Sequence, residues 1–165
     1  MVASEQGISD LLFLKKAKYK NMYENIVAPD QLNEYIEEQV NHSNSVKELN
    51  NFNNQLIILY IKNVAAGFAF VKRTPFFPEV LKDKRILNYS FFYVLPEHDT
   101  LEARMSLWEK SLSASMMSDA VWIEILQDDP LKPFLKSCGF NIQEKSSMLP
   151  FGLPSYIMIR YKSNN

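Results

Sequence analysis

The sequence is poor in the residue types that build metal and nucleotide sites. It has one cysteine, two histidines and four glycines among 165 residues. The single thiol, Cys138, excludes an internal disulfide and a multi-cysteine metal centre. His42 and His98 have no second ligand at helix or strand spacing in the same element, so no metal is expected. The scattered glycines form neither a P-loop nor a dinucleotide fingerprint.

Charge of one sign is also scarce. The 18 basic and 19 acidic residues leave a net charge of −1, and no block of five like charges occurs. Such a balance gives no general attraction to nucleic acid or to an anionic membrane surface. The chain lacks a run of about 18 apolar residues, and its first 30 residues do not resemble a secretory signal. We therefore expect a cytoplasmic protein with neither a nucleic-acid partner nor a membrane partner.

Apolar side chains, by contrast, are plentiful at 47% of the sequence. This composition fits a folded domain that buries about two-thirds of its unfolded surface, and we expect residues 1–165 to form one domain. Periodicity predicts helices over 11–24, 29–40, 100–118 and 131–137, and strands over 55–62, 64–72, 86–95, 121–126, 142–148 and 156–161. A further strand is allowed for in the first eight residues. The order predicts an α+β fold, with one mixed, mostly antiparallel central sheet of about six or seven strands flanked by about four helices.

Local signals mark some of the element ends. Ser9 and Asp10 are residue types that cap a helix N-terminus, so the first helix is expected to begin after them. Gly139 follows the short helix and predicts its C-terminal stop. Gly67, inside the second strand, predicts a bulge or the close approach of another backbone.

Four short segments, in this order and spacing, resemble the GNAT superfamily of N-acetyltransferases. They are Tyr23-Glu24-Asn25-Ile26, Ala66-Gly67-Phe68, Val94-Leu95-Pro96-Glu97, and Phe134 followed by Gly139-Phe140. The resemblance implies a GNAT-like sheet that binds acetyl-CoA at a splayed pair of central strands. It also implies transfer of an acetyl or related acyl group from CoA to the amine of a small molecule or peptide.

The loop after Pro96 departs from the family pattern. In the family this loop reads Arg/Gln-x-x-Gly-x-Gly/Ala, and its amides hold the CoA diphosphate at a helix N-terminus. The matching positions here are Asp99, Glu102 and Arg104, which makes this a divergent, degenerate donor loop. One interpretation is a capping box, in which Asp99 caps the helix and the protein's own carboxylates fill the anion site. The other is a rearranged phosphate site that Arg104 or His98 reaches.

The resemblance also assigns residues to the candidate site. The cofactor-contacting residues that it implies are Phe92, Tyr93, Val94, Leu95, Asp99, Thr100, Leu101, Glu102, Ala103, Arg104 and Phe134. The strand backbone among them needs no particular side chain to bond a pantetheine arm or an acyl carbonyl. After Phe134 the family often has a tyrosine that protonates the departing thiolate, whereas this chain has Leu135.

Glu124 is the sole carboxylate in a strand position suited to a general base. Its alternative role is that of a solvent-facing or hydrogen-bonded strand glutamate. Tyr89, Phe91 and Tyr93 share one side of their strand, where they either line a binding slot or fill the core.

Two functions follow from these residues. The leading hypothesis is an N-acyltransferase with an atypical donor site. The alternative is a non-catalytic binding module of the same fold that has lost acetyl-CoA binding and uses its cleft or its surface, including self-association as a homodimer.

Overall fold

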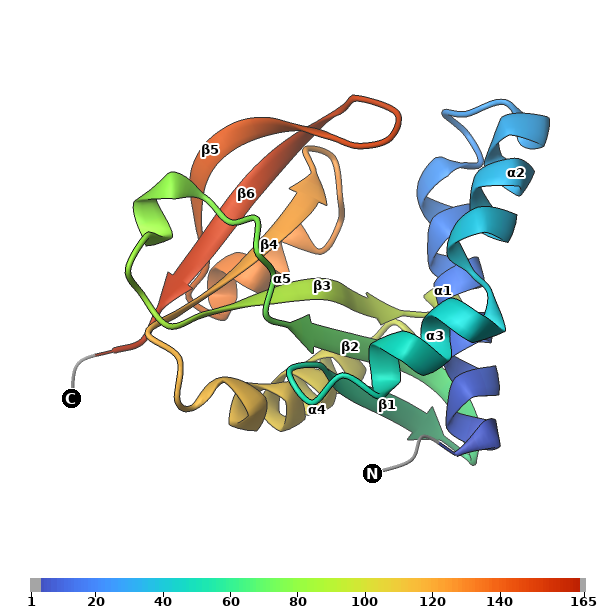
Figure 1. Cartoon of the computed structure of the whole chain (residues 1–165), viewed down its shortest axis with the longest axis horizontal. Coiled ribbons are helices and arrows are strands. Elements are labelled where there is room, and N and C mark those ends of the chain that lie inside the picture. The colour runs from blue at the N-terminus through green and yellow to red at the C-terminus, as the bar shows by residue number, and fades with distance from the viewer. Residues whose placement is uncertain (1–3, 164–165) are drawn as a thin grey trace. The chain divides into compact units, whose positions relative to one another are not determined.

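The structure, a computed structural model, describes residues 4–163 and has the predicted α+β architecture (Figure 1). The helices are α1 (Glu5–Tyr23), α2 (Pro29–Gln39), α3 (His42–Leu49), α4 (Leu101–Leu112) and α5 (Lys132–Ser137). The strands are β1 (Gln55–Ile61), β2 (Val64–Lys72), β3 (Ile86–Val94), β4 (Ala120–Leu126), β5 (Asn141–Met148) and β6 (Leu153–Tyr161). Three short 3₁₀ turns are η1 (Glu79–Leu81), η2 (Pro96–His98) and η3 (Ser113–Ser115). Within residues 4–163, no helix combines the length and the apolar character that crossing a membrane requires.

The six strands form one sheet in the order β1-β2-β3-β4-β6-β5. Strands β1 and β2 are joined by Lys62 and Asn63, whose φ angles of 49° and 65° fit the two-residue turn that matches the strand twist. β3 pairs with β4 in parallel, whereas β6 pairs with β4 and β5 in antiparallel fashion. The mixed, mostly antiparallel sheet confirms the predicted fold class.

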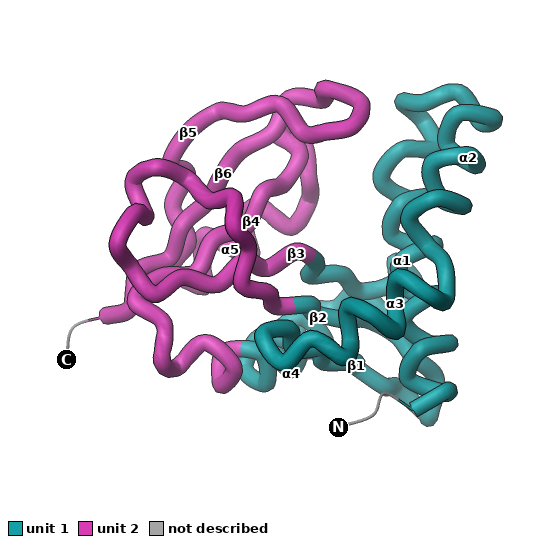
Figure 2. Tube along the Cα trace, in the orientation of Figure 1, with its two compact units in different colours: residues 1–70, 91–111 teal, residues 71–90, 112–165 magenta. Residues whose placement is uncertain are grey.

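Backbone contacts divide the chain into two compact units (Figure 2). Of the described residues, the first unit contains 4–70 and 91–111, and the second contains 71–90 and 112–163. The boundaries fall inside β2 and β3 and at the last residue of α4, so each of these elements contributes to both units. The expectation of a single domain stays a prediction.

The core of the first unit lies between α1 and the strands. Leu11 and Leu14 are on one face of α1, three residues apart, and both are fully buried. They pack in one cluster with Phe68 of β2 and with Tyr93 and Leu95 at the end of β3. The candidate site therefore begins on a strand end that this core holds in place.

A buried lysine connects α1 to α3 within the first unit. Lys15 is only 4% exposed, and its Nζ lies 2.5 Å from Oε2 of Glu48. The same Nζ lies 5.6 Å and 5.4 Å from the ring centroids of Phe70 and Phe91. Because a buried charge is costly unless it is paired, the carboxylate and the two ring faces together stabilise the ammonium. This pair gives α3 a specific place against α1.

The second unit has its own core on both faces of its strands. Leu81 of η1 packs with Ala120 of β4 and Ile159 of β6. The rings of Tyr89 and Phe140 meet edge to face, with centroids 6.3 Å apart. Both rings are almost fully buried, so they contribute directly to the packing of this unit.

The predicted start of the first helix is wrong. α1 begins at Glu5, and Ser4 is its N-cap because its Oγ accepts from the Gly7 amide at 3.0 Å. The extra turn buries Ile8, a gain that the cap signal at Ser9 did not take into account. The strand allowed for in the first eight residues is wrong over 5–8, and residues 1–3 lie outside the described range.

Two further elements differ from expectation. α3 was not predicted, because its eight residues are mostly polar and only Ser45 among them is buried. Its N-cap is Asn41, whose side chain accepts from the Asn44 amide at 2.9 Å. The helix predicted over 100–118 ends as α4 at Leu112, and η3 follows it.

The C-terminal stop predicted at Gly139 is confirmed. Gly139 has φ +94°, its amide donates to the Lys136 carbonyl, and the Phe140 amide donates to the Leu135 carbonyl. These two bonds form the Schellman arrangement, which satisfies the last carbonyls of α5 and favours glycine at the left-handed position. The chain thus turns sharply from α5 into β5.

Gly67 brings two backbones close together, as the sequence predicted. A Cβ added to Gly67 would lie 2.6 Å from the carbonyl oxygen of Tyr93 and 3.1 Å from the Cα of Val94. Both atoms belong to the backbone of β3, so a flexible side chain cannot simply move away. The close approach of β2 to β3 therefore depends on the absence of a side chain at this position.

We expect Gly67→Ala to destabilise the protein by about 1–3 kcal/mol, because a methyl group would force β3 away from β2. Thermal melting followed by circular dichroism measures this as a lower midpoint. Gly7→Ala is the matched control: its added methyl meets only the Oγ of Ser4, at 3.1 Å, and helix propensity favours alanine. Equal midpoints for the two variants would contradict the role assigned to Gly67.

Candidate active site

The candidate site starts where β3 leaves the sheet. The amide of Leu95 donates to the carbonyl of Ala66 on β2 at 2.8 Å. Successive amides of a strand point to opposite sides, so the Val94 amide points away from β2. The side chains from Phe92 to Leu95 are all buried. A ligand at this strand would meet its backbone, as expected from the sequence, and not these side chains.

The turn after β3 leads directly into α4. In η2, the His98 amide donates to the Leu95 carbonyl at 2.9 Å. Thr100 then caps α4, because its Oγ1 accepts from the Ala103 amide at 3.1 Å. The prediction that Asp99 is the N-cap is therefore wrong. Both residue types can cap a helix, and the length of the preceding 3₁₀ turn places the threonine, not the aspartate, at the capping position.

Asp99 instead binds an arginine on the first turns of α4. Its Oδ1 accepts from Nε of Arg104 at 2.6 Å, and its Oδ2 accepts from Nη2 at 2.6 Å. The two side chains are 27% and 20% exposed, respectively. Two parallel, charge-assisted bonds define a bidentate pair, the strong geometry for arginine and a carboxylate. Asp99 thus neutralises Arg104 and does not accept from the first amides of α4.

The first turn of α4 keeps donors for an anion. Among residues 4–163, the amides of Leu101 and Glu102 have no hydrogen-bond acceptor. Unpaired first-turn amides carry the positive end of the helix dipole. The Glu102 side chain is exposed and does not reach back as the capping-box prediction required. A diphosphate here would meet two open amides, together with repulsion from the carboxylates of Glu102 and Asp99.

Tyr93 supplies a neutral phenol at the end of β3. The residue is 7% exposed, and Lys18 Nζ lies 5.3 Å from its ring centroid. Burial raises the pKa of Tyr93 to about 12, with further contributions from the carboxylates of Glu97, Asp99 and Glu24. The phenol is therefore protonated at neutral pH, so Tyr93 can donate a hydrogen bond but cannot act as a base.

Glu124 lies on β4 in the second unit. β4 pairs with β6 along its whole length, and Glu124 stands opposite Ile157. Its Oε1 accepts from Oγ of Ser155, a fully buried residue, at 2.7 Å. Within the described residues, Oε2 has no hydrogen-bond donor. Ser155 therefore fixes the orientation of the Glu124 carboxylate. No signal in the sequence pointed to this role of Ser155.

The parallel pairing of β3 and β4 is short. It covers Ile86–Asn88 against Ala120–Trp122. At its end the Asn88 side chain donates to the Trp122 carbonyl at 3.3 Å, and Ser90 Oγ donates to Asn88 Oδ1 at 2.8 Å. Side chains thus take over where the backbone ladder stops. A polar pair in an otherwise apolar strand was the sequence signal for this.

The remaining predicted positions fill the core of the second unit. Phe134 is 5% exposed and Leu135 is 1% exposed, both on α5. Leu135 stands where the family tyrosine was sought, and its side chain donates no hydrogen bond. In the described part of the chain, three or more His, Cys, Asp or Glu side chains nowhere gather into a metal-binding group.

The chain was compared with protein-family models, with curated protein sequences and with solved structures. No protein-family model and no curated protein sequence matches the chain. Solved structures do match. The PaiA N-acetyltransferase of Thermoplasma acidophilum, in complex with coenzyme A, superposes with a TM-score of 0.73 at 12% identity, covering 98% of this chain and 97% of that one. A GCN5-related N-acetyltransferase of Rhodopseudomonas palustris superposes with a TM-score of 0.68 at 12% identity, covering 96% and 92%.

The chain has the GNAT fold. ElaA of Escherichia coli agrees with it as well, at a TM-score of 0.66 and 15% identity, with 96% of this chain and 92% of that chain covered. At such low identity the likeness is one of fold alone. The GNAT fold confirms the resemblance seen in the sequence. Which residues bind or react stays a prediction.

Proposed function

We propose that this protein is an N-acyltransferase of the GNAT fold, which moves an acetyl or related acyl group from CoA to an amine. The observation that carries the proposal is the start of α4. Leu101 and Glu102 keep open amides at the start of α4, which the turn η2 joins to β3, and the Val94 amide of β3 points away from β2. These are the backbone donors that a diphosphate and an acyl carbonyl need, and they do not depend on the missing glycines.

At the start of α4, the backbone amides suit the diphosphate of CoA, whereas the carboxylates of Asp99 and Glu102 repel it. The open amides of Leu101 and Glu102 would hold one phosphate at the positive end of the helix dipole. Arg104 would bind the other after exchanging the Asp99 carboxylate for it, since a phosphate accepts the same bidentate geometry. When bound, acetyl-CoA supplies an activated thioester carbonyl for attack by an amine.

Glu124 is our candidate for the group that takes the proton of the amine. Ser155 holds Oε1, which leaves Oε2 to accept that proton as the new carbon–nitrogen bond forms and the carbon–sulfur bond breaks. Leu135 gives the departing thiolate no proton, so we propose that it leaves as the anion or takes its proton from water. The amine belongs to a small molecule or a peptide.

Acetyl-CoA is expected to stabilise the folded protein. At about one hundred times its dissociation constant, a ligand adds about 2.7 kcal/mol of stability. For a chain of this size that raises the melting midpoint by several degrees. Differential scanning calorimetry at millimolar acetyl-CoA measures the shift. Pantetheine, which lacks the diphosphate, is the matched ligand and should shift the midpoint much less.

The second candidate function is a non-catalytic GNAT-fold binding module that self-associates as a homodimer. It is favoured by Leu135 in place of a donor and by the bidentate pair of Asp99 with Arg104. An unchanged melting midpoint with acetyl-CoA, together with no heat of CoA binding, would support this second function and contradict the acyltransferase proposal.

A further inference from the structure

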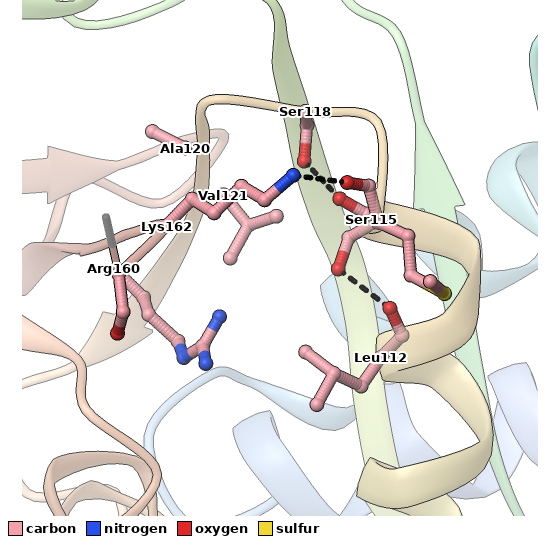
Figure 3. A pocket seen from close by; sticks show the side chains of 9 residues that line it. Leu112, Ser115, Ser118, Ala120, Val121, Arg160 and Lys162 are labelled. Carbon is pink, nitrogen blue, oxygen red and sulfur yellow. Dashed lines mark hydrogen bonds between the residues drawn. The ribbon is translucent and has the colours of Figure 1, made fainter. Parts of the chain in front are cut away.

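The second unit contains a pocket of about 240 Å³ beyond the C-terminal end of α4 (Figure 3). Leu112, Arg160 and Lys162 are among the residues that line it. Nζ of Lys162 donates to the Met116 carbonyl at 2.8 Å, which ties the chain after β6 to the turn after α4. This lining holds the unit together and does not define one class of ligand. A surface whose chemistry does define its partner lies in the first unit, at the edge of the sheet.

Strand β1 forms one edge of the sheet (Figure 1). The two-residue turn after β1 makes Ile61 a hydrogen-bonded pair with the first residue of β2, so the Ile61 amide points to β2. Because amides alternate along a strand, the amides and carbonyls of Leu56, Ile58 and Tyr60 point away from β2. Within residues 4–163 these groups have no backbone partner. Their spacing is the one with which another extended chain pairs.

The strand also lacks the features that protect a sheet edge from pairing. Its seven residues, Gln55–Ile61, include no charge, no proline and no glycine, and all but Gln55 are apolar. The edge strand at the other end of the sheet order, β5, carries Glu144 and Lys145 and has a register shift at Glu144. Charges and bulges of this kind prevent an edge from recruiting another strand. Thus β5 is protected, whereas β1 is open.

The sequence of β1 is complementary to itself. In an antiparallel pair of two copies centred on Ile58, Leu56 of one copy lies opposite Tyr60 of the other. Opposed apolar side chains of this kind stabilise adjoining strands. Just outside the strand, Lys62 lies opposite Asn54, so like charges do not oppose each other in this stretch. Every outward amide of one copy meets an outward carbonyl of the other.

Exposed apolar side chains flank the strand at both ends. Phe52, three residues before Gln55, is 94% exposed, and Val64, three residues after Ile61, is 54% exposed. Antiparallel pairing brings the start of β1 in one copy beside the end of β1 in the other. It therefore brings Phe52 of each copy toward Val64 of the other and covers two apolar side chains that water otherwise surrounds.

The apolar surface of this edge continues onto α1. The Tyr60 hydroxyl donates to Oδ2 of Asp10 on α1 at 2.5 Å, which places the exposed tyrosine beside that helix. Phe13 follows Asp10 by three residues, so it lies on the same side of α1, and it is exposed as well. A partner at the β1 edge would therefore meet two aromatic side chains in addition to the open backbone.

We propose that two copies of this chain form a homodimer by antiparallel pairing of β1 with β1. The contact uses the same surface of both copies, so it closes after two, and the protected β5 edge does not extend it. It gives the homodimer of the second candidate function a surface, and it does not depend on whether the chain transfers an acyl group. One strand pair is smaller than a standard interface of about 800 Å² per partner, so we expect a dissociation constant in roughly the micromolar range.

Sedimentation velocity of the full chain, without CoA, from about 1 to 200 µM tests the pairing. The average mass should rise with concentration from that of one copy toward that of two. Hydrogen exchange locates the contact. The amides of Leu56, Ile58 and Tyr60 should exchange more slowly as the fraction of dimer grows, whereas the amides of β5 should not change. A single-copy mass at every concentration overturns the proposal, and so does a dimer that leaves these three amides unprotected.

Two variants at one position separate the backbone from the side chain. Ile58→Pro removes the outward amide at the centre of the pair, and proline is tolerated where an edge amide does not bind the neighbouring strand. Ile58→Ala is the matched control, because it loses the same side-chain packing and keeps the amide. We expect Ile58→Pro to dimerise at least about tenfold more weakly than Ile58→Ala. Equal dissociation constants for the two variants refute the assignment. If Ile58→Pro fails to fold by circular dichroism, hydrogen exchange of the unaltered chain decides.

Discussion

Glu124→Gln is expected to lower kcat for acyl transfer by about a hundredfold or more, the usual effect of removing a general base. The amide is nearly isosteric and still accepts from Ser155 through its carbonyl oxygen, so the fold and the packing of β4 should persist. What disappears is the proton acceptor. The measurement is the initial rate as a function of pH, with saturating acetyl-CoA and a panel of amines. Release of the free CoA thiol reports the rate.

Two companion variants show whether the loss belongs to the carboxylate. Ser155→Ala keeps Glu124 but removes the bond at 2.7 Å that orients it, and should give a smaller loss with a retained pH dependence. Glu144→Gln removes a carboxylate at an exposed position of β5 and should leave kcat unchanged. A Glu124→Gln enzyme within threefold of the wild-type rate would leave Glu124 as a hydrogen-bonded strand residue, which was the alternative.

Asp99→Asn is expected to tighten CoA binding by about tenfold. The pair of Asp99 with Arg104 is partly exposed, and such pairs contribute about 1 kcal/mol or less, so releasing the arginine costs little stability. The substitution also removes a negative charge next to the open amides of Leu101 and Glu102, where repulsion opposes a diphosphate. A tenfold change corresponds to about 1.4 kcal/mol. Calorimetric titration with CoA measures it directly.

The control removes the same charge farther along the same helix. Glu109→Gln is exposed on α4 away from its start and should change the CoA affinity by less than a factor of about two. Arg104→Gln in the Asp99→Asn background should abolish most of the gain, because the gain depends on a released guanidinium. If Asp99→Asn and Glu109→Gln bind CoA equally well, the aspartate does not restrain the donor loop.

Much of the fold was predictable because burial leaves a repeating mark on the sequence. The strands over 55–62, 64–72 and 86–95 have long apolar runs, and each appears within a residue or so of the predicted bounds. α3 has no such mark, and the ion pair that joins it to α1 links distant residues: Glu48 meets the buried ammonium of Lys15, 33 positions earlier in the chain. Such a contact between distant residues leaves no periodicity to detect.

The candidate site divides in the same way. The sequence showed that residues 99–104 lack the family glycines and that Leu135 replaces a tyrosine. It did not show which hydrogen-bond donor each carboxylate would bind. Asp99 and Thr100 are adjacent and equally able to cap a helix, so only the folded turn decided between them.

The sequence by itself determined the fold class, the position of the elbow after β3 and the absence of the family's small residues there. These features depend on residue type and spacing, which the chain carries without folding. Only the tertiary structure decided that Asp99 binds Arg104, that Ser155 orients Glu124 and that Arg160 and Lys162 share a pocket with Leu112. The physical reason is that hydrogen-bond partners and cavities depend on atoms within a few ångströms of each other, and folding alone brings those atoms together.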